Sequence, residues 1–131
     1  MIMIYYIHTI IMLQLGRCTL LITSKENGNA FKNQEFCMGV FRQMGTYNDK
    51  PLYKQDEGGC YLFYCKEDKS WGIGPQDPNK NCYNTIYMKN TCVSSDGDGP
   101  DQLNSPWQYW SRKENTWKQD DQSIQVHVLQ G

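Results

Sequence analysis

The chain has 131 residues, and its 13 basic and 14 acidic side chains give a formal charge of −1. This length fits a single domain with one modest core, and the near-neutral charge argues against nucleic acid or an anionic membrane surface as a partner, because both need clustered Lys and Arg. Six cysteines, nine tyrosines and four tryptophans are typical of a thin aromatic core reinforced by disulfides.

An apolar, uncharged segment begins the chain at residues 1–15, MIMIYYIHTIIMLQL. The preferred interpretation is a cleaved signal peptide over residues 1–18, although a positively charged start and a small-x-small cleavage site are missing. A membrane anchor is the second, but the apolar run reaches the roughly 20 residues of a span only by including Gly16, Arg17 and Cys18. A strand or helix of the fold itself is the third. On the first interpretation the protein is secreted, keeps no stable membrane span after processing, and folds in an oxidising compartment.

Residues 19–35 are expected to form a polar linker, because residues 25–34 (KENGNAFKNQ) are rich in turn formers. A single β domain is expected over residues 36–131, where short β-prone runs alternate with clusters of Asn, Asp, Gly and Pro. None of these runs has helical periodicity over three turns. The runs cover residues 36–44, 51–54, 60–65, 70–74, 84–89, 107–110 and 123–129. The predicted fold is therefore all-β, a small antiparallel β-meander or sandwich-like module of six to eight strands, stabilised by disulfides.

The run CYLFYC, residues 60–65, is apolar on both faces, because side chains alternate along a strand. This predicts a central strand covered on both sides, either by core twice or by core and a loop or partner. Cys60 and Cys65 would have Cα atoms roughly 16 Å apart, whereas a disulfide needs about 4.4 to 6.8 Å. These two cysteines are therefore not expected to bridge each other.

The predicted β domain contains five cysteines as disulfide candidates: Cys37, Cys60, Cys65, Cys82 and Cys92. A zinc site or a redox motif is disfavoured, because the sequence has no Cys-x-x-Cys pair. We expect Cys82 to pair with Cys92, which closes a short loop, and Cys37 to pair with Cys60 or Cys65. The cysteine left over is either buried and free or links two chains as a homodimer.

Catalytic chemistry has little support in the sequence. His8 lies in the apolar N-terminal segment, and His127 alternates with the apolar side chains of IQVHV, so it is expected to face solvent. No Asp or Glu lies in an apolar run that would raise its pKa. The chain is predicted to be no enzyme and to use no cofactor; a small secreted hydrolase is the weakest hypothesis.

The loop at residues 94–106 places three carboxylates close together: Asp96, Asp98 and Asp101. Oxygen ligands at such spacing can hold calcium, although the EF-hand pattern is absent. A solvated loop is the simpler interpretation, and a weak structural calcium site is the alternative.

Aromatic side chains are the candidate ligand-binding residues: Trp71, Trp107, Tyr109, Trp110 and Trp117. In WQYW, Trp107 and Tyr109 share one face of a strand and Trp110 takes the other. An exposed indole can stack on a sugar or on a partner's side chain. The alternative is that all four tryptophans build the core.

Residues 39–75, GVFRQMGTYNDKPLYKQDEGGCYLFYCKEDKSWGIGP, are followed by WQYW, Trp117 and IQV. This pattern resembles a small module that recurs in secreted and multi-domain extracellular proteins, especially of invertebrates. The resemblance covers about residues 39–128, and it implies an extracellular all-β unit with structural glycines and aromatics but no defined activity. The positions that carry it are Gly39, Phe41, Gly45, Tyr47, Asn48, Lys50, Pro51, Tyr53, Tyr61, Tyr64, Trp71, Ile73, Gly74, Trp107 and Trp117.

The leading functional hypothesis is a secreted, non-enzymatic binding module that recognises an extracellular glycan or protein through surface aromatics. The second is a structural or matrix component that assembles through an unpaired cysteine or an exposed sheet edge.

Overall fold

The computed structural model describes residues 19–25, 28, 34–80, 85–91, 99–103, 106–120 and 124–129. The predicted signal peptide, residues 1–18, lies outside this part of the chain.

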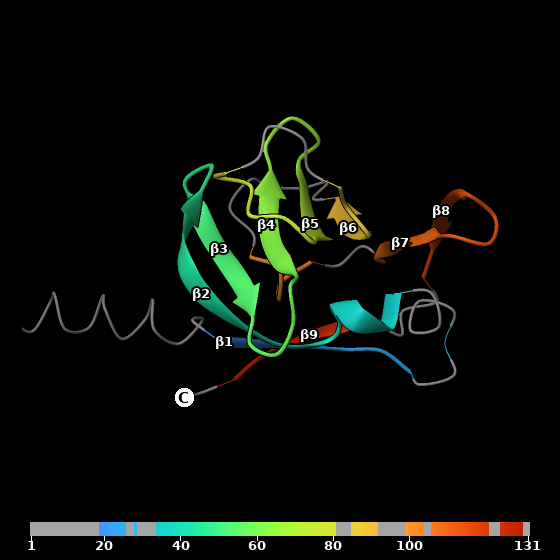
Figure 1. The fold of residues 1–131 in the computed structure, drawn as a ribbon, viewed down its shortest axis with the longest axis horizontal. Coiled ribbons are helices and arrows are strands. Elements are labelled where there is room, and N and C mark those ends of the chain that lie inside the picture. Colours follow the sequence, from blue (N-terminus) through green and yellow to red (C-terminus); the bar gives the residue numbers. More distant parts are fainter. Residues whose placement is uncertain are drawn as a thin grey trace, which may run out of the picture.

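One antiparallel sheet makes up almost all of the described structure (Figure 1). Its strands follow each other in chain order, β8-β7-β6-β5-β4-β3-β2-β1, and β9 is added next to β1. The described elements are β1 (Thr19–Thr23), the 3₁₀ turn η1 (Glu35–Cys37), β2 (Gly39–Tyr47), β3 (Lys50–Gln55), β4 (Tyr61–Cys65), β5 (Ser70–Gly74), β6 (Met88–Thr91), β7 (Gln108–Ser111), β8 (Thr116–Gln119) and β9 (Gln125–Val128). The prediction of an all-β antiparallel fold is confirmed, although the described sheet has nine strands instead of six to eight, and β9 departs from the meander order.

The sheet has to curl, because a short connection joins its two edge strands. Nine flat strands about 4.8 Å apart would be about 38 Å wide. The chain from Gln119, which ends β8, to Gln125, which begins β9, spans at most roughly 22 Å. Curling therefore brings the two edges towards each other and encloses one face of the sheet.

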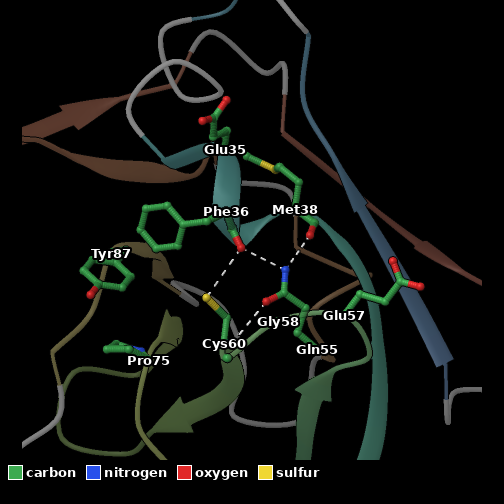
Figure 2. Close-up of a pocket in the computed structure, with 10 residues that line it drawn as sticks. Glu35, Phe36, Met38, Gln55, Glu57, Gly58, Cys60, Pro75 and Tyr87 are labelled. Carbon is green, nitrogen blue, oxygen red and sulfur yellow. Dashed lines mark hydrogen bonds between the residues drawn. The ribbon is translucent and has the colours of Figure 1, made fainter.

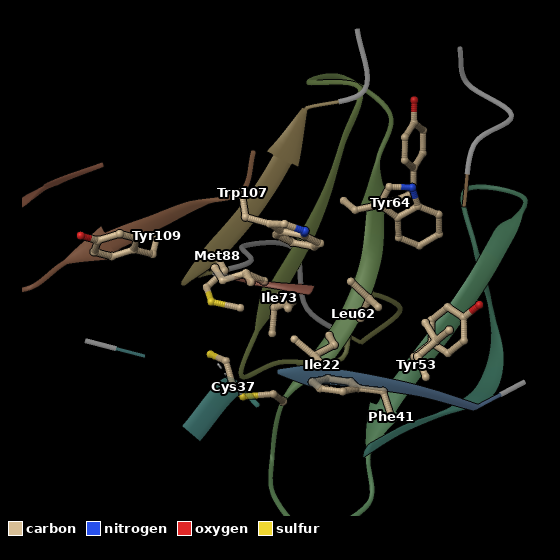
Figure 3. Close-up of a cluster of buried hydrophobic side chains, with 14 residues drawn as sticks. Ile22, Cys37, Phe41, Tyr53, Leu62, Tyr64, Ile73, Met88, Trp107 and Tyr109 are labelled. Atoms are coloured by element: carbon tan, nitrogen blue, oxygen red, sulfur yellow. Dashed lines mark hydrogen bonds between the residues drawn. The ribbon is translucent and has the colours of Figure 1, made fainter. Parts of the chain in front are cut away.

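The enclosed face forms the hydrophobic core, to which most of the strands contribute. Figure 3 shows Ile22, Phe41, Leu62 and Ile73, from four different strands, in the same interior. The buried members are Leu20, Ile22, Cys37, Phe41, Tyr53, Cys60, Leu62, Tyr64, Trp71, Ile73, Met88, Trp107, Tyr109 and Ile124.

Strand β1 corrects the predicted domain boundary. The sequence assigned residues 19–35 to a linker, but β1 pairs with β2 on one side and with β9 on the other. Leu20 and Ile22 are fully buried and alternate with half-buried neighbours, which is the period of a strand. The sequence did not predict this strand, because its alternating pattern is short and polar residues follow it.

Strand β4 is the central strand that its apolar faces predicted. It lies fifth of nine in the sheet, and Phe63 on its outer face is fully buried. Tyr47 packs edge-on against Phe63 with ring centroids 5.8 Å apart. The segment after β5 returns over the same face, where a Cβ added to Gly72 would lie 3.1 Å from Ile86. The core therefore covers one face of β4 and a loop covers the other, which is one of the arrangements that the sequence predicted for this strand.

The turn between β2 and β3 also agrees with its sequence. Asn48 and Asp49 both have positive φ angles, 53° and 62°, between the paired residues Tyr47 and Lys50. Two such residues make the tight hairpin turn whose twist suits neighbouring strands. The Asn48 amide also donates a 2.9 Å hydrogen bond to the carbonyl of Tyr64, which ties the turn to β4.

Candidate binding surface on the β7–β8 hairpin

The structure divides the five candidate aromatic residues into two groups. Trp71, Trp107 and Tyr109 are 0%, 4% and 5% exposed and belong to the core. Trp110 and Trp117 are only half-buried. The first three therefore stabilise the fold, and the surface available to a ligand carries the last two.

Trp110 and Trp117 form a cross-strand pair on the hairpin of β7 and β8. Their ring centroids are 5.7 Å apart and their planes make an angle of 76°. The pairing follows from the turn at residues 112–115, where Asn115 has a positive φ of 55° and donates its backbone N–H to the carbonyl of Ser111 at 2.8 Å. A turn of this length places the two indoles opposite each other.

The two indoles are on the face of the hairpin that points away from the core. Along β7, Tyr109 is buried and its neighbours Gln108 and Trp110 are half-buried. Gln108 pairs with Gln119 on β8, two residues from the tryptophan pair on each strand. Residues two apart along a strand share a face, so two amides lie beside the two indoles.

Lys89 on β6 extends this surface. It pairs with Gln108 across the strands, and its Nζ lies 4.3 Å from the ring centroid of Trp117. An ammonium group at this distance is attracted to the electron-rich face of the indole. At the edge of the hairpin, Lys118 forms an ion pair with Glu114, and the hydrogen bond to Glu114 raises the pKa of Lys118.

The hairpin projects from the curled sheet (Figure 1), and two hydrogen bonds anchor its base to the body while a third joins its two arms. The fully buried Gln34 donates its side-chain amide to the carbonyl of Trp110 at 2.7 Å. The N–H of Trp110 donates to the carbonyl of Tyr87 at 2.8 Å, and that of Asp120 to the carbonyl of Trp107 at 2.8 Å. The projecting indoles are thus fixed to the body of the protein.

Cys37, Cys60 and Cys65 are the described cysteines, and all three are unbridged. The Sγ atoms of Cys37 and Cys60 are 4.0 Å apart, and both residues are buried. Their hydrogen bond raises the pKa of Cys37, with burial adding to the effect, and lowers the pKa of Cys60. Cys65 lies at the far end of β4 from Cys60, as the strand spacing predicts. The predicted partners Cys82 and Cys92 lie outside the described residues.

The predicted calcium ligands are described only in part. Asp101 is half-buried in the turn at residues 99–102, and Asp96 and Asp98 lie outside the described residues. Within the described part of the chain, three or more His, Cys, Asp or Glu side chains do not come together as a metal site would require.

His127 is exposed on β9, as its alternation with Ile124, Val126 and Val128 predicts. Its Nε2 lies 3.4 Å from Oγ1 of Thr23 on the neighbouring strand. This contact places the imidazole beside a threonine hydroxyl at the edge of the sheet, and the structure assigns it no reaction.

Sequence reasoning missed the polar residues that surround the indole pair. Strand β8 was absent from the predicted runs, although the polar stretch RKEN, residues 112–115, separates Trp110 and Ser111 from a second short segment that contains Trp117. Treating RKEN as a four-residue hairpin loop would have paired Trp110 with Trp117. The position of Lys89 needed the β6–β7 register, which no local pattern reveals.

Comparison with protein-family models, with curated proteins and with solved structures found no match to this chain. Among the described residues, the structure has no helix with the length and hydrophobicity needed to cross a bilayer.

Proposed function

We propose that this protein is a secreted, non-enzymatic binding module that recognises an extracellular glycan or protein through the indoles of Trp110 and Trp117. The observation that carries this proposal is the fixed, half-exposed tryptophan pair on the projecting hairpin. A rigid aromatic surface loses little conformational entropy when it binds. Tryptophan is also among the residues that contribute most to binding energy at protein surfaces.

The polar neighbours of the indoles favour a glycan over an apolar ligand. Gln108 and Gln119 offer amide donors and acceptors on the same face, and Lys89 offers an ammonium group. A sugar presents C–H groups on one face and hydroxyls around its edge, so stacking and hydrogen bonds can form together. The paired indoles with flanking amides supply both types of contact.

The test is a screen of the full-length protein against an array of glycans, followed by titration of tryptophan fluorescence. Trp117→Ala is expected to weaken binding about tenfold or more, as loss of a central aromatic contact does. Tyr61→Ala is the matched control, since Tyr61 is also half-buried under a lysine, with Lys54 Nζ 5.9 Å from its ring centroid. Equal binding by wild type and Trp117→Ala would refute the proposed surface.

Secretion would place Cys37 and Cys60 in an oxidising compartment, and we propose that they form a disulfide there. The two sulfur atoms, 4.0 Å apart in buried side chains, would have to approach each other by about 2 Å to reach the length of an S–S bond, about 2.05 Å. Each thiol loses a proton, and the disulfide of a cellular oxidant takes up the two electrons and two protons as it is reduced to two thiols. Such a bridge would join η1 to the residue that directly precedes β4.

Mass spectrometry of the non-reduced protein secreted from eukaryotic cells tests this bridge. We expect a peptide pair linked through Cys37 and Cys60 that separates on reduction. Free thiols at both positions, or a bridge from either residue to another cysteine, would contradict the pairing.

The edges of the sheet support assembly as the second candidate function. Among the described strands, β8 and β9 each have a neighbour on one side only, and such edges can pair with another chain. This alternative predicts oligomers in solution, which analytical ultracentrifugation measures; a monomer at all protein concentrations would contradict it.

A further inference from the structure

A pocket lies between η1 and the β3–β4 connection, away from the tryptophan pair. Its volume is about 500 Å³, within the range of pockets that hold small molecules. Figure 2 shows Phe36, Tyr87 and Pro75 on one side of it, and Gln55 and Gly58 on the other. The pocket is thus lined largely by apolar and aromatic groups on one side.

Phe36 and Tyr87 form two walls that meet at nearly a right angle. Their ring centroids are 4.9 Å apart and their planes make an angle of 84°. Phe36 is 42% exposed, the only aromatic side chain among the large exposed hydrophobic residues of the described chain. An exposed ring held against a second ring leaves an aromatic corner open to a ligand.

Hydrogen bonds hold this corner in place. The amide Nε2 of Gln55 donates to the carbonyls of Phe36 and Met38 at 2.8 and 2.7 Å. The Oε1 of Gln55 accepts the backbone N–H of Cys60 at 3.2 Å. One buried side chain therefore fixes η1 against β3 and β4, so Phe36 is positioned before any ligand arrives.

The charges at the pocket select its ligand. Glu35 and Glu57 are exposed at its edge, and its lining residues include no Lys or Arg among those described. Two carboxylates at a pocket whose described lining holds no cation favour a positive ligand and disfavour an anionic one. Aromatic faces are also attracted to cations, and quaternary ammonium groups are bound by rings arranged in this way.

We propose that this pocket binds a small organic cation of the alkylammonium type that carries no anionic substituent. The methyl groups of the ligand contact Phe36, Tyr87 and Pro75, and its charge interacts with the ring faces. The carboxylates of Glu35 and Glu57 point outward at the rim of the pocket (Figure 2) and attract the cation at longer range. This site is separate from the tryptophan surface, and the proposal stands whether or not that surface binds a glycan.

Calorimetric titration of the full-length protein with three related probes tests the charge preference. Choline is the cation, 3,3-dimethylbutanol is its neutral isostere, and phosphocholine adds an anionic group. We expect choline to bind about two- to fivefold more tightly than the alcohol, the size of an exposed cation–π interaction, and also more tightly than phosphocholine. No choline binding at millimolar concentration, or equal affinities for choline and the alcohol, would overturn the proposal.

Two variants with matched controls locate the site. Phe36→Leu keeps an apolar side chain and removes the ring, and we expect it to weaken choline binding about fivefold. Met44→Leu is its control, because Met44 is 49% exposed on β2 and does not line the pocket. Glu35→Gln is expected to weaken binding, and Glu67→Gln in the β4–β5 turn to leave it unchanged. Circular dichroism confirms that each variant is folded. Wild-type affinity in both Phe36→Leu and Glu35→Gln would contradict the assignment.

Discussion

Neighbouring aromatic residues in this chain have different roles, because side chains alternate between the two faces of a strand. On β7, Tyr109 is 5% exposed in the core, and the adjacent Trp110 is half-buried on the outer face. The sequence predicted that Tyr109 and Trp110 occupy opposite faces. It left open which face the core would cover, because both faces of WQYW carry large rings.

The two kinds of tryptophan should differ in their contribution to stability. Trp71→Ala removes a fully buried side chain from the core and is expected to lower the free energy of unfolding by about 3–5 kcal/mol. Trp117→Ala removes a half-exposed ring and should cost about 1 kcal/mol or less. Urea denaturation measures both values. Equal losses for the two variants would contradict the division between core and surface.

Cys65 should be a poorly reactive thiol at neutral pH. Burial, followed by the nearby carboxylates of Asp68 and Glu67, raises its pKa from 9.0 to about 11. Because only the thiolate reacts, alkylation by iodoacetamide should keep rising about tenfold per pH unit beyond pH 9 and level off near pH 11. Peptide mass spectrometry across this range gives the rate at Cys65. A plateau near pH 9 would show an ordinary thiol, and would make Cys65 a better candidate for linking two chains.

At the scale of elements, strands bounded by clear turns were the most predictable. β3, β4 and β5 lie within or close to the runs predicted at residues 51–54, 60–65 and 70–74. Strand β1 was missed because it has only five residues and lies between the apolar N-terminal segment and a polar stretch. The turn η1 was missed because its place depends on long-range hydrogen bonds to Gln55 that no local pattern contains.

The inclusion of β1 in the fold can be measured directly. Ile22 is fully buried between β2 and β9. Ile22→Ala should therefore lower the free energy of unfolding by about 2–4 kcal/mol. The matched control is Leu21→Ala on the half-buried positions of the same strand, which is expected to cost less. If Ile22→Ala unfolds at the same urea concentration as wild type, residues 19–23 would be a linker, as the sequence first suggested.

At the scale of the whole molecule, the sequence predicts a meander but not the way it curls. Alternating apolar residues and turns follow from local chemistry, and so does the antiparallel order of neighbouring strands. Pairing of β1 with β9 joins residues about 100 positions apart in the chain, and this pairing is invisible to local patterns. The same holds for the approach of Cys37 to Cys60, whose Sγ atoms are 4.0 Å apart. The sequence left open whether Cys37 lies beside Cys60 or Cys65.

Both candidate sites depend on this curled sheet. Gln34 and η1 follow β1 in the chain, and their hydrogen bonds reach β7 on one side and β3 on the other. The segment that carries Phe36 thus also supports the base of the tryptophan hairpin. Local side chains supply the chemistry of each site, and the long-range packing of this segment fixes their positions.

The most direct test of the central claim is a fluorescence titration with the glycan that the array ranks highest, using wild type, Trp117→Ala and Tyr61→Ala. The account predicts that Trp117→Ala loses about tenfold or more in affinity and that Tyr61→Ala binds like wild type. Equal affinity of Trp117→Ala and wild type, or an equal loss in the two variants, would contradict it.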